Sequence, residues 1–358
     1  MARTLPSNEL LITAGNFSLD DTVNPEGEAA AAPGGDGLYS AIGAAVWRYP
    51  VAILSRVGSD YPAVFMNSIA GLGIRIDMIR TAPGPTVHYR ITNADSGERV
   101  YEHLTPAQRL HELSPQGPDL DAVSRGRWVH VAAMPIDVQD ELISKCRAEG
   151  VPYSLDPHEE YIIEHEERLA GLIHGSLFSP SQLELELLFP DLADRPPQDM
   201  ARAAAERLLA MGAKAVAIKL GATGSFVADS SYEAAVPALP TLVIDSTGAG
   251  DAFCGGFLAG YLRTDSLLLG AACGGVSAAH VIKGFGAFHS DLPTPESLTM
   301  QTTSLLREVA EADRTTTLLR TCFPWLASVE YELPGSKEAT DDELPDDPKG
   351  RIKRSESR

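Results

Sequence analysis

Short apolar runs alternate with helical segments along most of this chain. Runs bounded by Gly, Pro or Asp predict buried strands at residues 10–14, 51–57, 128–133, 152–155, 172–178, 215–220, 225–228 and 242–244. Apolar positions with helical spacing predict helices at residues 38–47, 61–72, 137–148, 181–188, 201–211, 252–263, 267–282 and 297–326. This alternation is typical of an α/β protein whose mainly parallel sheet lies between helices.

Residues 86–104 follow a different pattern, with apolar and polar side chains in strict alternation. The residues Asp95-Ser96-Gly97 supply a turn within this segment. The pattern predicts a β-hairpin with one apolar and one polar face. We expect it to form, with residues 15–35, a small β-sheet lid over a ligand cleft, although such a lid could also join two chains in a homodimer. His88, Arg90 and Thr92 on its polar face either meet solvent or contact the ligand.

The charge and composition of the chain exclude several classes of binding partner and of cellular location. The chain has 29 Lys and Arg against 49 Asp and Glu, a net charge of −20, which argues against a surface for nucleic acid or anionic membrane. No stretch reaches the ~18 apolar residues of a membrane helix, and residues 1–10 lack a signal-peptide pattern. Cys146, Cys254, Cys273 and Cys322 are scattered, without metal-site spacing or a His partner. We therefore expect reduced thiols and a cytoplasmic protein.

The chain is expected to form one domain over residues 1–332, with an additional helical region at about 296–330. From residue 333 to residue 358 the sequence loses its apolar periodicity and becomes acidic, then basic. That composition predicts a disordered charged tail.

The segment Asp245-Ser246-Thr247-Gly248-Ala249-Gly250-Asp251 carries the strongest chemical signal. Its small residues allow a tight turn in which several backbone N–H groups converge at a helix N-terminus, so they predict an anion site suited to a transferring phosphoryl group. Asp251 is placed in the first helical turn, where it could accept the proton of an attacking hydroxyl. The alternative is that the two glycines only pack the helix and Asp251 caps it.

These residues resemble the C-terminal signature of the ribokinase-like (PfkB) carbohydrate kinase family. Weaker similarities follow in the family's order over about 290 residues: Gly15 to Asp20, Pro33-Gly34-Gly35, Val57-Gly58-Ser59-Asp60, Ser181-Gln182-Leu183-Glu184 and Lys219-Leu220-Gly221-Ala222-Thr223-Gly224. The resemblance implies a three-layer α/β/α sandwich with a small β-sheet lid, and transfer of the γ-phosphate of ATP to a hydroxyl of a sugar, polyol or nucleoside.

The same resemblance implies roles for individual residues. Asp251 would be the catalytic base, and the amides of Gly248, Ala249 and Gly250 would form the anion hole. ATP would lie along Lys219, Gly221 and Gly224, with its adenine near Ala278 to Gly284. The acceptor would meet Asp20, Gly35, Asp36 and Tyr39. Glu184 would organise Mg²⁺ through water, while Asp245 and Thr247 lie where many members hold a monovalent cation such as K⁺.

Two departures from the family pattern concern the metal network and the acceptor contacts. Ser181 stands where Asn is usual, and Asp36, Leu38 and Tyr39 replace the usual acceptor contacts. Arg90 would suit a phosphorylated sugar, whereas Asp20 and Asp36 favour neutral hydroxyls, so we expect an unphosphorylated acceptor. The altered acceptor region leaves a non-catalytic sugar or nucleoside sensor on the same fold as the alternative. A P-loop kinase and a dinucleotide-binding dehydrogenase lack their motifs.

Overall fold

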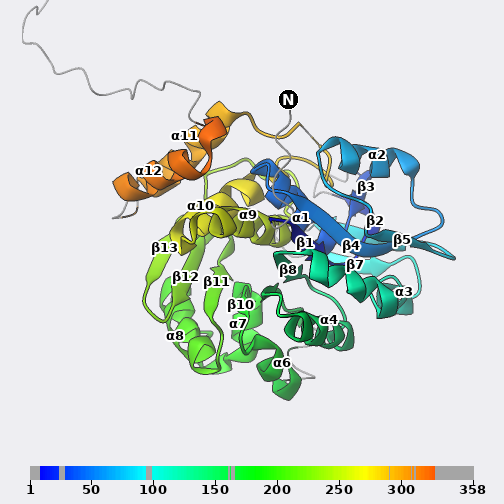
Figure 1. The fold of residues 1–358 in the computed structure, drawn as a ribbon, viewed down its shortest axis with the longest axis horizontal. Helices are drawn as coiled ribbons and strands as arrows, with labels where there is room; N and C mark the ends of the chain where they lie inside the picture. Colours follow the sequence, from blue (N-terminus) through cyan, green and yellow to red (C-terminus); the bar gives the residue numbers. More distant parts are fainter. Residues whose placement is uncertain are drawn as a thin grey trace, which may run out of the picture.

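The computed structural model describes residues 9–23, 29–93, 99–159, 162, 166–289, 291–307, 309 and 312–326, and it forms three layers (Figure 1). Within these residues the main sheet has nine strands in the order β13-β12-β11-β10-β9-β8-β1-β4-β5. They span, in chain order, β1 Leu11–Ala14, β4 Val51–Gly58, β5 Ile79–Ala82, β8 Trp128–Val131, β9 Tyr153–Leu155, β10 Leu177–Phe178, β11 Ala215–Lys219, β12 Ser225–Asp229 and β13 Glu233–Val236. The pairs from β11 to β5 are parallel, whereas β12 pairs antiparallel with both of its neighbours.

Helices cover both faces of this sheet. One face carries α1 Asp36–Val46, α9 Ala249–Thr264 and α10 Leu267–Val281, and the other carries α4 Ile136–Glu149, α6 Glu166–Ile173, α7 Gln182–Leu188 and α8 Pro197–Ala210 (Figure 1). Before the C-terminal region, the other described helices are α2 Ala63–Gly71, α3 Gln108–Glu112 and the 3₁₀ turns η1 Gly117–Arg125, η2 Pro190–Leu192 and η3 Gly221–Thr223. Successive strand residues point to opposite faces, so Leu11 joins one apolar core and Ile12 joins the other. The predicted α/β/α architecture is confirmed.

The small sheet consists of four strands in the order β3-β2-β6-β7, with bounds β2 Ser18–Val23, β3 Ala29–Gly34, β6 Val87–Asn93 and β7 Arg99–His103. β6 and β7 form the predicted antiparallel hairpin, and β2 pairs in parallel with β6. The turn predicted for the β6–β7 hairpin at Asp95-Ser96-Gly97 lies outside the described residues. The sheet projects from one end of the main sheet (Figure 1).

Two predicted strands are wrong. Residues 172–178 are the end of α6 followed by the two-residue strand β10, and Gly175 with φ 81° makes the turn between them. The apolar residues of this segment therefore belong to two elements, the face of a helix and a strand. The periodicity of apolar residues alone does not show where one ends and the other begins. Residues 242–244 are not a strand either. Leu242 is 78 % exposed, and the Ile244 amide bonds to the Ile282 carbonyl at 2.8 Å rather than to a strand of the sheet.

The C-terminal helical region comprises α11 Pro295–Leu306, α12 Ala312–Cys322 and η4 Pro324–Leu326, rather than one continuous helix. It packs on the face of α10 (Figure 1). Phe323 is fully buried, with its ring centroid 5.3 Å from that of Trp47 and the Arg263 guanidinium 4.9 Å above it. The predicted tail at residues 333–358 lies outside the described residues. Among the described helices, none combines the length and apolar character needed to cross a membrane.

Because Phe323 fills a closed site, Phe323→Ala is expected to lower the free energy of unfolding by about 3 kcal/mol. Val64→Ala, an apolar truncation at a side chain that is 63 % exposed, should change it by less than about 0.5 kcal/mol. Urea unfolding measures both. Equal, small losses in the two variants would show that the C-terminal region is not part of the core.

Candidate active site

The N-termini of α1 and α9 meet because small residues let these two helices pack closely. A Cβ atom on Gly43 would overlap the Ala252 carbonyl, and one on Gly255 would overlap the Ser40 carbonyl. The close packing places Asp36, the first residue of α1, within electrostatic range of Asp251 in the first turn of α9. Two carboxyl groups that are far apart in the sequence therefore share one site.

The turn before α9 is held by Asp245. Its Oδ1 accepts hydrogen bonds from the Thr247 amide at 3.0 Å and the Thr247 hydroxyl at 2.7 Å. Gly248 then adopts φ 75°, and a Cβ atom there would overlap the Tyr39 ring, so both the conformation and the space require glycine.

The helix start supplies backbone donors. The Ala249 amide donates to the Ser246 carbonyl at 3.3 Å, whereas the amides of Gly248 and Gly250 occupy positions for which an α-helix supplies no carbonyl partner. The positive end of the α9 dipole lies at the same point. Of the three predicted anion-hole amides, Gly248 and Gly250 are thus the two suited to bind an anion directly.

Lys219 brings a positive charge beside these amides. Its Nζ lies 2.5 Å from Asp156 Oδ1 in an ion pair whose side chains are 13 % and 5 % exposed. A Cβ atom on Gly250 would be 3.6 Å from Lys219 Nζ. Burial alone lowers the pKa of Lys219, but Asp156, Cys254 and Glu184 outweigh it, and the net shift is upward. Lys219 therefore stays charged next to the start of α9.

Glu184 reaches the same region from α7. Ser181 caps this helix: its hydroxyl accepts from the Glu184 amide at 3.3 Å, and Glu184 Oε2 accepts from the Ser181 amide. Ser181 also forms a bridge to Lys219 of β11, which brings α7 to the site. Burial raises the pKa of Glu184 to about 7, although Lys219 opposes the shift. The cap formed by Ser181 thus fixes the position of Glu184.

Carboxyl groups crowd this site. Burial raises the pKa of Asp251 well above its usual range, and the charges of Asp36 and Asp156 add to the effect, whereas Lys219 opposes it. Burial, then Asp156 and Asp20, raise the pKa of Asp36 to about 7. These groups repel one another when ionised, so the site favours cations. A divalent metal ion such as Mg²⁺ fits this donor set, with oxygen ligands available from carboxylates.

Asp20 in β2 marks the end of the site under the small sheet. Its side chain is 5 % exposed, and its Oδ1 has no hydrogen-bond partner among the described residues. Burial raises the pKa of Asp20 to about 7. Gly34 leaves room for this carboxyl group, because a Cβ atom there would overlap Asp20 Oδ2. Gly35, with φ 106°, then begins α1. An unpaired buried acceptor of this kind suits a hydroxyl donor.

The polar face of the small sheet is engaged within the sheet. Arg90 Nη1 lies 3.2 Å from Glu102 Oε2 across the β6–β7 pair, and His88 Nε2 lies 3.4 Å from Asp21 Oδ1. Arg90 is therefore neutralised by a partner on its own exposed face.

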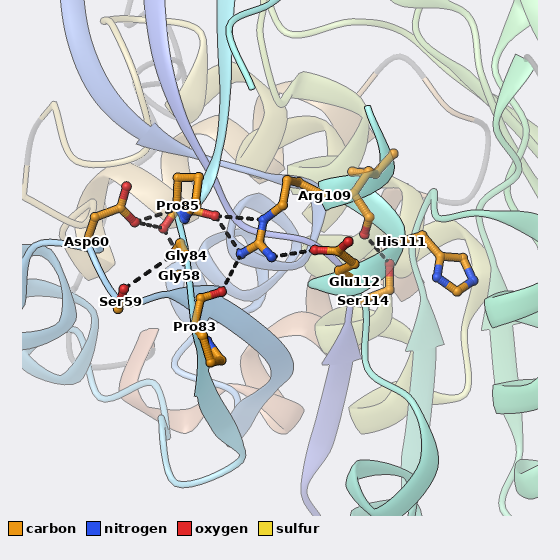
Figure 2. Close-up of polar contacts among 12 residues, drawn as sticks. Gly58, Ser59, Asp60, Pro83, Gly84, Pro85, Arg109, His111, Glu112 and Ser114 are labelled. Carbon is orange, nitrogen blue, oxygen red and sulfur yellow. Dashed lines mark hydrogen bonds and ion pairs between the residues drawn. The ribbon is translucent and has the colours of Figure 1, made fainter. Parts of the chain in front are cut away.

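The chain entering β6 is fixed from two sides (Figure 2). Asp60 Oδ1 accepts from the Thr86 amide and the Thr86 hydroxyl, both at 2.7 Å. On the other side, Arg109 donates to the Pro85 carbonyl at 2.7 Å and to the Pro83 carbonyl at 3.2 Å, while it pairs with Glu112. The Val57-Gly58-Ser59-Asp60 motif thus anchors the base of the small sheet, a role its sequence does not reveal.

The residues predicted for ATP come from the end of β11 with the loop after it, and from the end of α10 with the loop that follows. Gly221 begins η3, two residues after Lys219, and Gly224 follows η3; both glycines have positive φ. Ala278 lies in the last turn of α10 and Gly284 follows that helix. The exposed residues 242–244 run beside the same loop, because Ile244 bonds to Ile282. An exposed apolar strip therefore borders the predicted adenine position.

Sequence reasoning missed three residues at the centre of the site. Asp156 follows β9, His130 lies in β8 and Cys254 lies one turn after Asp251 in α9. The expectation that no cysteine has a His partner is wrong for Cys254, whose ligand atom lies within 4.8 Å of those of His130 and Asp156. These residues are more than 20 positions apart in the sequence, so only their place on adjacent strands and a covering helix reveals them.

Comparisons with known proteins agree with this architecture. The structure matches that of ribokinase from Arabidopsis thaliana complexed with ribose and ATP, with a TM-score of 0.66, 20 % identity, and coverage of 82 % of this chain and 98 % of the other. The fold is therefore ribokinase-like.

Sequence comparison defines the family. Residues 8–295 match the model of the pfkB family of carbohydrate kinases. The chain is 28 % identical over 284 residues to a cytidine kinase of Thermococcus kodakarensis, covering 77 % of this chain and 97 % of the relative. It is 38 % identical over 245 residues to an uncharacterised sugar kinase of Archaeoglobus fulgidus, covering 66 % and 92 %. This chain belongs to the pfkB family of carbohydrate kinases, and it is a kinase of sugars or nucleosides.

Proposed function

We propose that this protein transfers the γ-phosphate of ATP to a hydroxyl of an unphosphorylated sugar, polyol or nucleoside, with Asp251 as the general base. The observation that carries the proposal is the position of Asp251, in the first turn of α9 between the Gly248 and Gly250 amides and the Lys219–Asp156 pair. A carboxylate, an anion hole and a buried cation are the groups that phosphoryl transfer requires.

In this proposal the Asp251 carboxylate accepts the proton of the acceptor hydroxyl as that oxygen bonds to the γ-phosphorus. The bond from the γ-phosphorus to the bridging oxygen breaks, and ADP leaves with the electron pair. The amides of Gly248 and Gly250 and the Lys219 ammonium stabilise the negative charge on the transferring group. Mg²⁺, organised by Glu184 through water, would neutralise part of the nucleotide charge. K⁺ at Asp245 and Thr247 stays a prediction.

The acceptor lies, in this proposal, between Asp251 and the small sheet, in contact with Asp20, Gly35, Asp36 and Tyr39. Asp20 and Asp36 accept hydrogen bonds from neutral hydroxyls and repel a phosphate group. Arg90, paired with Glu102, does not offset that repulsion. The similarity to a cytidine kinase and to a ribokinase complexed with ribose supports a sugar or a nucleoside as the acceptor.

ATP, in the same proposal, contacts Lys219, Gly221 and Gly224 with its phosphates. Its base lies near Ala278 and Gly284, where the exposed apolar residues 242–244 offer a surface for an aromatic ring. The small sheet closes over the acceptor and excludes water, which otherwise competes as phosphoryl acceptor. A homodimer through this sheet and a cytoplasmic location remain expectations.

ADP formation with Mg²⁺ and ATP, measured over a panel of acceptors, tests the proposal. The panel contains ribose, deoxyribose, fructose, cytidine, inosine, glycerol and fructose 6-phosphate. We expect acceptor-dependent turnover with at least one neutral compound and none with the phosphorylated sugar. Turnover with the sugar phosphate alone would overturn the acceptor class, and binding without any turnover would favour the sensor.

The crowding of carboxyl groups predicts a distinctive pH dependence. Asp251 must be ionised to accept a proton, and burial raises its pKa, so kcat/KM should rise at a pH well above the usual range of a carboxyl group. Asp36→Asn removes a negative charge that contributes to this shift, so the acid limb should move to lower pH. Asp121→Asn is the control. The Asp121 carboxyl group is 80 % exposed and pairs with Lys145 rather than with a residue of the carboxyl cluster around Asp251. An unmoved limb in Asp36→Asn would show that the two carboxyl groups are not coupled.

A further inference from the structure

Three metal-binding side chains lie together beneath the active site. His130 comes from β8, Asp156 from the end of β9 and Cys254 from α9, one helical turn after Asp251. One ligand atom from each lies within 4.8 Å of the others, and all three side chains are buried. The proposed phosphoryl transfer uses Asp156 only as the partner of Lys219 and makes no use of the other two.

The hydrogen bonds of His130 and Asp156 leave one possible ligand atom on each without a strong partner, whereas Cys254 Sγ lies 3.3 Å from Ser179 Oγ and 3.9 Å from Lys219 Nζ. Ser154 Oγ lies 3.0 Å from His130 Nδ1, and His130 Nε2 is buried without a hydrogen-bond partner among the described residues. Asp156 gives Oδ1 to Lys219, so its Oδ2 remains and lies 3.4 Å from Cys254 Sγ. An unsatisfied buried nitrogen is costly in free energy, and a bound ion would satisfy it.

The contact between His130 and Ser154 is the kind that supports a metal ligand. Histidines that bind metals usually donate their second ring N–H to a neighbouring acceptor, which fixes the ring and leaves the other nitrogen for the ion. Trp128 Nε1 also donates to Ser154 Oγ, at 3.2 Å, and so fixes this hydroxyl. The imidazole is therefore oriented from two elements of the main sheet before any ion binds.

The donor set selects the ion. One sulfur, one nitrogen and one oxygen suit Zn²⁺ and similar ions, whereas Mg²⁺ takes oxygen ligands. Ligand atoms around a tetrahedral zinc ion lie roughly 3.5 Å apart. Because the three atoms here lie within 4.8 Å of one another, they need to approach by at most about 1.3 Å. Such changes are within the reach of side-chain rotation on a fixed backbone.

Charge and access also agree with a cation at this position. Asp156, Glu184, Asp36 and Asp251 surround Lys219 within electrostatic range, so carboxyl groups outnumber the ammonium group in this cluster. The ion can arrive from the active-site side, where Lys219 retains 13 % exposure and Asp156 retains 5 %.

We propose that His130, Asp156 and Cys254 form a second metal site, which binds a thiophilic divalent ion of the Zn²⁺ class and is separate from the Mg²⁺ of the reaction. Binding replaces the S–H proton of Cys254 with a metal–thiolate bond and releases that proton to solvent. The ion also competes with Lys219 for the charge of Asp156. Occupancy of this site is therefore expected to weaken the ion pair beside the anion hole.

Titration of the metal-free, full-length protein with Co²⁺ tests the site without reference to activity. We expect a thiolate-to-cobalt charge-transfer absorption that saturates at one Co²⁺ per chain, disappears on addition of Zn²⁺ and survives excess Mg²⁺. Cys254→Ser should abolish the absorption, and His130→Asn should weaken Co²⁺ binding at least ~10-fold. Cys146→Ser removes an equally buried thiol of α4 and should leave the titration unchanged.

Circular dichroism and thermal melting establish that each variant is folded. Zn²⁺ should raise the melting temperature of the wild-type protein and of Cys146→Ser but not that of Cys254→Ser, because only a site in the folded state contributes to stability. The proposal is overturned if the wild-type protein shows no charge-transfer absorption, or if Cys254→Ser retains it. His130→Asn with unaltered Co²⁺ affinity would remove histidine from the site. All of these outcomes are independent of whether the protein phosphorylates any acceptor.

Discussion

Asp251→Asn is expected to lower kcat by ~10³-fold while leaving the binding of ATP and acceptor nearly unchanged. Asparagine keeps the size and hydrogen-bonding shape of the side chain but cannot accept the proton of the attacking hydroxyl. It also removes an ionisable group whose pKa burial and the charges of Asp36 and Asp156 raise. Stability should therefore not fall, since a buried carboxyl group is replaced by a neutral amide.

The control for this experiment lies at the other end of the same helix. Asp265 follows α9, is exposed and has φ 52°, a conformation that asparagine also adopts readily. Asp265→Asn should keep kcat within about twofold of the wild-type value, as surface substitutions generally do. Steady-state rates and calorimetric titration with a non-hydrolysable ATP analogue separate catalysis from binding. Full turnover in Asp251→Asn would remove Asp251 from the role of base.

Lys219→Met is expected to have the second large effect, on both stability and turnover. It leaves Asp156 buried without its cation, and breaking a buried ion pair from one side costs about 3 kcal/mol of unfolding free energy. It also removes the positive charge beside the anion hole, which should lower kcat/KM by ~10²-fold or more. Urea unfolding and steady-state kinetics at pH 8 measure the two effects.

A double variant separates the two roles of Lys219. In Lys219→Met/Asp156→Asn neither partner is charged, so we expect most of the lost stability to return. Turnover should not return, because the positive charge at the anion hole is still missing. Recovery of both properties would mean that the ion pair acts on activity only by maintaining the fold.

The glycine-rich signature could be interpreted from sequence because it acts through the backbone. Only Ala249 separates Gly248 from Gly250 along the chain, and their consequences, a tight turn and a helix N-terminus, are local. The position of Asp251 in the first turn follows from the same local geometry. The alternation of apolar runs likewise predicted the three layers, since burial of strands and helix faces imposes it.

Two short segments were wrongly predicted to be strands. Residues 172–178 form one apolar run, but the chain divides it between the end of α6 and the short strand β10. Residues 242–244 have the composition of a strand, yet they remain exposed beside Ile282. In both cases the outcome depends on whether a neighbouring strand is available to pair, and the sequence alone does not show this.

By itself, then, the sequence determined the α/β/α class, the hairpin of the small sheet and the glycine-rich turn that places Asp251 at the start of α9, because each depends on residues close together in the chain. Only the tertiary structure decided which groups surround Asp251. Close packing of α1 on α9 brings Asp36 to it, and adjacent strands bring Asp156 and Lys219 together. The same convergence places His130 beside Cys254, since electrostatics and metal ligation depend on distance in space rather than on position along the chain.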